Sequence, residues 1–459
     1  MMATVLAGGT VVTSVDCYRA DVRLDNGRIA AIGLDIAAAE DIVIDAAGCY
    51  LFPGGIDPHT HFDLPVGQTT TADDFASGTA AAAVGGTTTI LDFATQNKGE
   101  SLLEALANWH DKADGKCYID YGFHLAISDW NEAVQAEMTQ AVQAGVTSFK
   151  LYMAYKDVLQ VDDGVLLAAM QAAKANGALI CLHCENGDVI AALVQEALAQ
   201  ECTEPKFHAL TRPAILEGEA VNRAICLAHI AEAPLYVVHV SCADALAVIQ
   251  RAQQQGWPVY GETCPQYLLL DESKYQGQDF EAAKFVISPP LRAKENQPVL
   301  WQGLKNKHLA TTASDHCSFN FLQQKALGRH AFNKIPNGAP GVENRFGLLY
   351  TYGVCADKLT LKEFVAITST NAAKLFGLFP AKGTIEVGSD ADIVVWDPAI
   401  RTTITAQTQV QRVDYNAYEG FSQVGKPRAV YLRGQQIVEE GRLIAAEPSG
   451  RYIKRQPIS

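Results

Sequence analysis

The feature that most constrains the fold is a regular alternation through the middle of the chain. Short apolar segments with strand character are separated by Ala-rich stretches with helical spacing. The expected strands are 56–58, 87–93, 118–126, 147–153, 178–184, 235–240, 259–264 and 309–315, and the clearest helices are 165–175, 220–231 and 243–254. Alternating strands and helices form a parallel sheet, so the fold class is α/β. Eight such strands favour a closed (β/α)8 barrel of the TIM type over an open doubly wound sheet.

The two ends of the chain have a different pattern, rich in strands and poor in helices. Strand-like segments occur at 4–13, 21–24, 28–32, 41–44 and 49–52, and again at 392–396, 428–433 and 436–438. Asn26-Gly27 separates two of them and is typical of a two-residue hairpin turn. We therefore expect a small β-sandwich domain formed from both termini, residues 1–52 and 383–459, around a barrel of residues 53–382.

Composition narrows the classes of partner. The 459 residues can bury a large core, and 51 acidic against 36 basic residues give a net charge of −15. With no basic cluster, neither nucleic acid nor an anionic membrane is an expected partner. The N-terminus lacks the pattern of a secretory leader, and the 11 scattered cysteines suit a reducing compartment, so we expect a cytoplasmic protein. Cys181 and Cys184 flank His183 but are expected to be core thiols.

A possible metal site begins with Asp57-Pro58-His59-Thr60-His61, at the end of the first barrel strand. Alternate residues of a strand point the same way, so both imidazoles can face one ion. Alone, this pair would more simply be a polar strand end. Further candidates fall at other expected strand ends: His183 at the fifth, His239 at the sixth and Asp315 at the eighth. Since catalytic groups gather at the C-terminal ends of barrel strands, we expect these side chains to converge on a metal centre.

Lys150, in the fourth expected strand, is out of place among apolar neighbours. A buried ammonium is unfavourable unless it is paired or neutralised, and next to metal ions it has the wrong charge. A salt bridge is the simpler interpretation of a single such lysine. Reaction of the amine with carbon dioxide would instead give a carbamate, an anion able to bridge two metals. The remaining histidines are expected elsewhere: His110 and His229 in helices, and His208 and His330 in loops.

Together these residues resemble the amidohydrolase superfamily, and the chain is most similar to its dihydropyrimidinase/D-hydantoinase family. The matching stretches are 149–155 (FKLYMAY), 288–292 (SPPLR), 314–317 (SDHC), 335–338 (IPNG), 382–385 (KGTI) and 388–392 (GSDAD). The resemblance extends along nearly the whole chain. It implies two divalent metals, usually zinc, with His59, His61 and Asp315 on one, His183 and His239 on the other, and carboxylated Lys150 and a hydroxide bridging them.

The same resemblance implies an activity. The bridging hydroxide would open the ring amide of a cyclic ureide, a dihydropyrimidine or a 5-substituted hydantoin, to give an N-carbamoyl amino acid. Asp315 would carry the proton to the leaving nitrogen, and Tyr155 would stabilise the oxyanion. Ser288 and Asn337 would hold the ring, mainly through backbone groups. Leu64, Tyr152 and Leu159 would face the substituent, and the expected assembly is a homotetramer.

Two other classes of function remain possible. Allantoinase and dihydroorotase act on related rings, but the dihydroorotase pattern has an arginine two residues after the second histidine. Here Phe62-Asp63 follows His61, and an aspartate would repel a substrate carboxylate. A non-catalytic scaffold related to dihydropyrimidinase is the alternative from another class. Such scaffolds have lost metal ligands, whereas every ligand position of this chain is filled.

Overall fold

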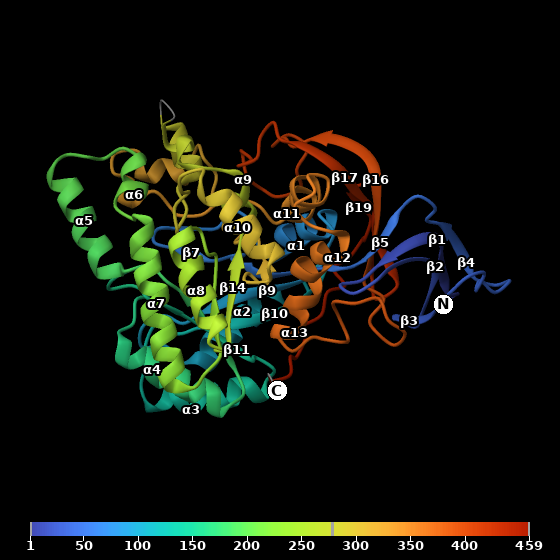
Figure 1. The fold of residues 1–459 in the computed structure, drawn as a ribbon, viewed down its shortest axis with the longest axis horizontal. Helices are drawn as coiled ribbons and strands as arrows, with labels where there is room; N and C mark the ends of the chain where they lie inside the picture. Colours follow the sequence, from blue (N-terminus) through green and yellow to red (C-terminus); the bar gives the residue numbers. More distant parts are fainter. Residues whose placement is uncertain (1, 277–279, 458–459) are drawn as a thin grey trace.

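The barrel expected from the alternation is present in the computed structural model, which describes residues 2–276 and 280–457 (Figure 1). Its eight parallel strands pair in chain order, and each expected segment overlaps one of them. They are β6 (Gly55–Thr60), β9 (Thr87–Thr95), β10 (Asp120–Ala126), β11 (Ser148–Tyr152), β12 (Leu179–His183), β13 (Leu235–Val237), β14 (Val259–Thr263) and β15 (Thr311–Thr312). The open doubly wound sheet is thereby excluded.

The barrel is closed by residues that follow the regular strands. β15 is only two residues long, so its pairing with β6 is replaced by an isolated parallel bridge between Thr60 and His316. The Asp57 carboxylate also accepts a hydrogen bond from the Ser314 backbone N–H at 3.0 Å. These contacts bring the end of the first barrel strand directly against the segment after the last.

Helices surround the barrel, and the three clearest expected helices are confirmed. The longer helices are α1 (Phe75–Val84), α2 (Leu102–Ala113), α3 (Glu132–Gln143), α4 (Asp163–Ala175), α5 (Gly187–Ala199), α7 (Ala214–Ala231), α8 (Ala243–Gln254) and α10 (Asn296–Lys305). In α8 the buried side chains are Ala245, Leu246, Ile249 and Ala252, one apolar stripe at helical spacing that packs on the barrel. Short helices are α6 (Lys206–Leu210), α9 (Pro265–Leu269), α11 (Arg345–Leu349), α12 (Leu361–Val365) and α13 (Asn371–Leu375).

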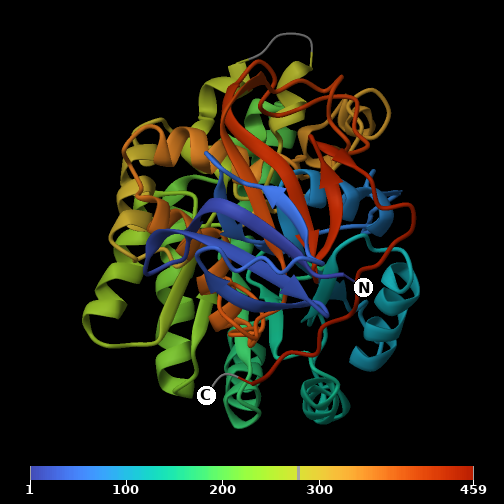
Figure 2. The same ribbon diagram turned by 90° about the vertical axis from the view of Figure 1, so that its right-hand side faces the viewer.

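A second sheet combines strands from both ends of the chain, as expected (Figure 2). Its order is β19-β18-β17-β16-β5-β1-β2-β3, and β4 pairs with β1. The strands are β1 (Thr4–Val12), β2 (Cys17–Asp25), β3 (Arg28–Gly33), β4 (Ile42–Asp45), β5 (Tyr50–Pro53), β16 (Ile393–Thr403), β17 (Ser422–Leu432), β18 (Gln435–Glu439) and β19 (Arg442–Leu443). Asn26 and Gly27 form the β2–β3 turn with positive φ angles of 48° and 79°. The antiparallel pairing of β5 with β16 joins the two ends.

After β19 the chain leaves this sheet and crosses the N-terminal ends of the barrel strands. Tyr452 forms a parallel bridge with Tyr121, and the buried Arg455 guanidinium donates to the Ser148 hydroxyl at 2.8 Å and to the Phe123 carbonyl. The tail therefore packs against one mouth of the barrel and leaves the other open. Among the described residues, no helix has the length and apolar character needed to cross a membrane.

Candidate active site

All nine residues expected from the sequence to bind metal or substrate line one cavity of about 1100 Å³. They are His59, His61, Lys150, Tyr155, His183, His239, Ser288, Asp315 and Asn337. The cavity lies at the C-terminal ends of the barrel strands, opposite the mouth against which the tail packs. This is the end at which the loops of α/β barrels carry their catalytic groups.

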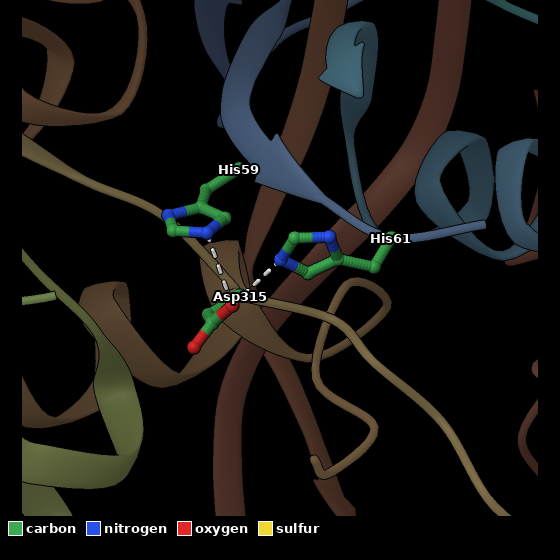
Figure 3. A group of neighbouring side chains, drawn as sticks. All are labelled: His59, His61 and Asp315. Carbon is green, nitrogen blue, oxygen red and sulfur yellow. Dashed lines mark ion pairs between the residues drawn. The ribbon is translucent and has the colours of Figure 1, made fainter. Parts of the chain in front are cut away.

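The first cluster in the cavity consists of His59, His61 and Asp315 (Figure 3). The Nε2 atoms of His59 and His61 lie 3.2 Å and 3.3 Å from the same carboxylate oxygen of Asp315. Burial alone would raise the pKa of Asp315, but the two histidines hold that pKa below its usual value. Two imidazole nitrogens and one carboxylate oxygen, all within 4.8 Å of one another, are a ligand set suited to a divalent transition metal.

The strand end that carries His59 and His61 is held by a buried carboxylate on β9. Asp92 accepts hydrogen bonds from the Thr60 hydroxyl at 2.8 Å, from the Phe62 backbone N–H at 2.9 Å and from the Trp109 indole at 3.0 Å. The first two bonds fix the residues on either side of His61, and the bond from Trp109 holds the Asp92 carboxylate itself. The direction of both imidazoles therefore follows from the packing of β6 against β9.

The second cluster is a pair of histidines on neighbouring strands. His183 ends β12, and its Nδ1 lies 3.0 Å from Nε2 of His239. The other ring nitrogen of His183 lies 2.8 Å from the Glu185 carboxylate. A proton on that nitrogen leaves Nδ1 with a free lone pair directed at His239. The rings of His59 and His239 lie 5.5 Å apart, so the two clusters are adjacent.

Glu262, on β14, connects the two clusters. Its carboxylate lies 2.8 Å from Nδ1 of His59 and accepts the backbone N–H of His239 at 3.1 Å. Its other oxygen accepts the Tyr236 hydroxyl at 2.7 Å. A proton held on Nδ1 of His59 leaves the Nε2 lone pair free to face Asp315. Burial raises the pKa of Glu262 to about 7.

Three of the expected ligands lie beyond the regular strands. His61 directly follows β6, which ends at Thr60. His239 and Asp315 were expected at strand ends, but β13 ends at Val237 and β15 at Thr312. Both residues adopt positive φ angles, 40° and 51°, and Tyr155 does so at 65°. A non-glycine residue in this region carries about 1–3 kcal/mol of strain, which the surrounding contacts must offset. The regular alternation of side chains along each strand stops before His239, Asp315 and Tyr155. Each of them adopts a left-handed backbone conformation, and its side chain lines the cavity.

Lys150 lies between the clusters, in the middle of β11, and is 1% exposed. Burial lowers its pKa to about 8. Among the described residues it forms no ion pair, and its Nζ lies 4.9 Å from the ring centroid of Phe93 and 5.2 Å from that of Tyr152. The lowered pKa increases the fraction of neutral amine, the form that reacts with carbon dioxide.

The structure also allows a test of whether these residues suit a pair of metals. Nδ1 of His61 is buried without a hydrogen-bond partner among the described residues, so its Nε2 is the nitrogen committed to Asp315. Between His183 and His239, two ring nitrogens face each other at a distance that requires a shared proton or a cation. Each cluster thus has ring nitrogens available for an ion, and the donors fit two divalent metals.

The residues expected to hold the substrate line the same cavity. The Asn337 amide donates to the Ser288 hydroxyl at 3.1 Å, so the two segments meet. Burial raises the pKa of Tyr155, so its phenol stays protonated and can donate a hydrogen bond. His208 was expected in a loop but belongs to α6, and its Nε2 bonds the Ile287 carbonyl at 2.7 Å. Leu64, Tyr152 and Leu159 line the same cavity.

Sequence reasoning missed several buried polar residues around this cavity, among them Glu185, Glu262 and Lys325. Glu262 stands in an apolar strand segment just as Lys150 does, so the same argument about unpaired charge would have marked it. Glu185 lies two residues after His183, in the segment that follows β12. Lys325 begins a 3-10 turn, Lys325–Gly328, in the long connection after the last barrel strand, where a lysine gives no signal of burial.

A parallel α/β barrel with a histidine and aspartate centre at the C-terminal ends of its strands defines a metal-dependent hydrolase. Comparisons with known proteins agree. The model of the "Amidohydrolase family" matches residues 50–437. A "D-hydantoinase" of Geobacillus stearothermophilus is 52% identical over 99% of this chain and 97% of its own length. A "Dihydropyrimidinase" of Rattus norvegicus is 44% identical over 99% of this chain and 89% of its own length.

Solved structures give the same result. The crystal structure of a dihydropyrimidinase from Brevibacillus agri NCHU1002 superposes with a TM-score of 0.99 at 53% identity, covering 100% of both chains. The chain therefore belongs to the dihydropyrimidinase/D-hydantoinase family of the amidohydrolases. As a member of that family it is a cyclic amide hydrolase that uses divalent metal.

Proposed function

We propose that this chain hydrolyses the ring amide of cyclic ureides, dihydropyrimidines or 5-substituted hydantoins, to N-carbamoyl amino acids. The observation that carries the proposal is the convergence of four histidines, Asp315 and Lys150 on one cavity, in a chain about half identical to D-hydantoinase along its length. In the reaction, water adds to the ring carbonyl carbon, the carbon–nitrogen bond breaks, and the ring nitrogen takes up a proton.

We assign the metal ligands by the two clusters. His59, His61 and Asp315 would hold one ion and His183 and His239 the other, and Lys150, once carboxylated on Nζ, would supply an anionic ligand to both. Zinc is the proposed metal, because imidazole nitrogen and carboxylate oxygen are ligands that it favours. When bound, the ions supply Lewis-acid chemistry and bring the pKa of water to about 7.

Proton transfer is assigned to Asp315. Its carboxylate is held ionised at neutral pH by the neighbouring histidines, so it can accept a proton from the attacking water. It then passes that proton to the leaving ring nitrogen. Tyr155, protonated and at the cavity wall, donates to the oxygen that becomes negative in the transition state.

The substrate ring is assigned to the part of the cavity lined by Ser288 and Asn337. Ser288 and Asn337 meet there, and their backbone groups can pair with the alternating N–H and C=O of a cyclic ureide. Leu64, Tyr152 and Leu159 face the substituent outside the ring. Dihydroorotase activity is disfavoured, since Asp63 stands where that enzyme's carboxylate-binding arginine would be required. A non-catalytic scaffold is disfavoured by the complete set of ligands.

Turnover tests the proposal. The metal-loaded protein should open dihydrouracil, dihydrothymine or a 5-substituted hydantoin, and should leave dihydroorotate and allantoin unchanged. Asp315→Asn should abolish turnover, while Asp244→Asn, an exposed carboxylate in the first turn of α8, should not change it. Faster turnover of allantoin or dihydroorotate than of every dihydropyrimidine and hydantoin would overturn the assignment.

Three further assignments concern the whole chain. We propose a division into a barrel of residues 53–382 and a β domain of residues 1–52 and 383–459, supported by the two separate sheets. A homotetramer is proposed on family resemblance, and sedimentation tests it. A cytoplasmic location is proposed because all 11 cysteines, each among the described residues, are free thiols.

A further inference from the structure

Lys325 is a buried lysine that the proposed mechanism leaves without a role. Its side chain is 0% exposed, and among the described residues no carboxylate pairs with it. Its Nζ instead donates to three backbone carbonyls: Val286 at 2.9 Å, Pro336 at 2.7 Å and Gly338 at 2.7 Å. An ammonium has three N–H groups, so this arrangement uses all of them. Burial lowers the pKa of Lys325 to about 7, while three carbonyl dipoles favour the charged form.

The three carbonyls belong to the two segments that face the substrate. Val286 lies two residues before Ser288, and Pro336 and Gly338 lie on either side of Asn337. In an extended chain, successive carbonyls point to opposite sides. The carbonyls of Pro336 and Gly338 face Lys325, whereas the Asn337 carbonyl between them accepts a hydrogen bond from the Cys317 thiol, on the cavity wall, at 3.7 Å.

The two segments also form hydrogen bonds and close contacts that do not involve Lys325. The Gly338 N–H also donates to the Val286 carbonyl, at 3.0 Å, so that carbonyl joins both segments. Gly338 has a φ of 147°, and a Cβ there would lie 2.3 Å from the Cys317 carbonyl oxygen. On the other segment, Nε2 of His208 lies 2.7 Å from the carbonyl oxygen of Ile287.

We infer that Lys325 is a positioning residue for substrate binding: its ammonium clamps the segments of Ser288 and Asn337 together and turns the Asn337 backbone toward the ring. The inference rests on the proposed function, in which those two residues hold the cyclic ureide. Lys325 contacts neither substrate nor metal, so its loss should weaken binding of the ring and leave the metal clusters and the chemical step intact.

The experiment compares Lys325→Met and Lys325→Gln with the unmodified, metal-loaded protein. For Lys325→Met, KM for dihydrouracil should rise about 10–100-fold, the effect of losing one or two hydrogen-bonding contacts to the ring. The kcat should stay within about threefold and the metal content should not change. Lys325→Gln keeps an N–H donor, so its KM should lie between that of the unmodified protein and that of Lys325→Met. Segments 286–288 and 336–338 should exchange their amide hydrogens faster in both variants.

Lys382→Met is the matched control. Lys382 is also buried, but it pairs with Asp120 and Asp392 between the barrel and the β sheet. Its loss should lower the unfolding temperature and leave both KM and exchange in the two segments unchanged. A folded Lys325→Met with KM within twofold would overturn the inference, as would a failure of both Lys325 variants to fold. If the unmodified protein opens no cyclic ureide, the proposed function fails, and amide exchange alone then decides the role of Lys325.

Discussion

Replacement of Glu262 by glutamine tests whether this carboxylate tunes the metal centre. At pH 8, above the raised pKa of Glu262, the carboxylate is ionised; glutamine keeps its volume and can still accept from Nδ1 of His59, but the acceptor is no longer charged. A hydrogen bond to a charged group contributes about 1.5–3 kcal/mol, and a neutral one about 0.5–1.5. The loss at His59 is therefore about 1–2 kcal/mol, with a smaller loss at the backbone of His239. Since 1.4 kcal/mol is tenfold, zinc affinity should fall about 10–100-fold.

The assay is competition for zinc between the protein and a chelator of known affinity, together with thermal unfolding of the metal-free protein. Glu343→Gln is the control, because Glu343 accepts two backbone N–H groups, from Val410 and Gln411, and forms no contact with the histidines. Zinc affinity of Glu262→Gln within twofold of the unmodified protein would refute the reasoning. Glu262→Ala is less informative, because it leaves Nδ1 of His59 and the backbone N–H of His239 unpaired at about 1–3 kcal/mol each, enough to endanger folding.

The remaining predictions use the same protein. Metal analysis should find close to two divalent ions per chain, with activity lost on chelation and restored by zinc, manganese or cobalt; one ion at full activity would contradict the two clusters. Tyr155→Phe should lower kcat about 10²–10³-fold with little change in substrate binding, and a near-normal kcat would make Tyr155 a packing residue. Lys150→Ala and Lys150→Arg should both lose the metal pair and most activity, and acetate should partly rescue the alanine variant. Mass analysis of the unmodified protein under non-denaturing conditions should show one added carboxyl group. Burial raises the pKa of Glu343 to about 7 from a usual value near 4.5, so the folded state binds the extra proton and stability falls as pH rises between these values. Glu343→Gln should therefore be more stable than the unmodified protein at pH 8, by about 1–3 kcal/mol, with the difference disappearing near pH 4 in chemical unfolding.

Most of the barrel could be predicted from the sequence, because buried parallel strands and amphipathic helices have different apolar periods. All eight strands were expected, and 243–254 matches α8 to the residue. β15 was expected over seven residues but has two regular ones. Where the barrel closes, an isolated bridge between Thr60 and His316 takes the place of regular pairing between β15 and β6. A contact between residues so far apart gives no local signal in the sequence.

The convergence of these side chains on one cavity was predictable for a related reason: histidines and a lysine near apolar strand ends are costly without a function. The residues that orient them were not marked in this way, because their role depends on neighbours from other strands. Glu262 reaches His59 across 203 positions of sequence. Lysine is usually found at the surface, and nothing in the sequence around Lys325 indicates otherwise. Its burial follows only from the three carbonyl groups that it contacts in the folded chain.

The pairing of β5 with β16 also has a consequence for biosynthesis. Residues 50–53 leave the ribosome some 340 positions before their partners at 393–396, so the central sheet of the β domain stays incomplete while the barrel is translated. Until then β5, which lies between β1 and β16, is an open edge able to pair with other nascent chains. Chains truncated before residue 393 should keep that edge and aggregate, even where the barrel is complete. Pairing with β16, one of the last strands to be synthesised, thus removes the exposed edge of β5.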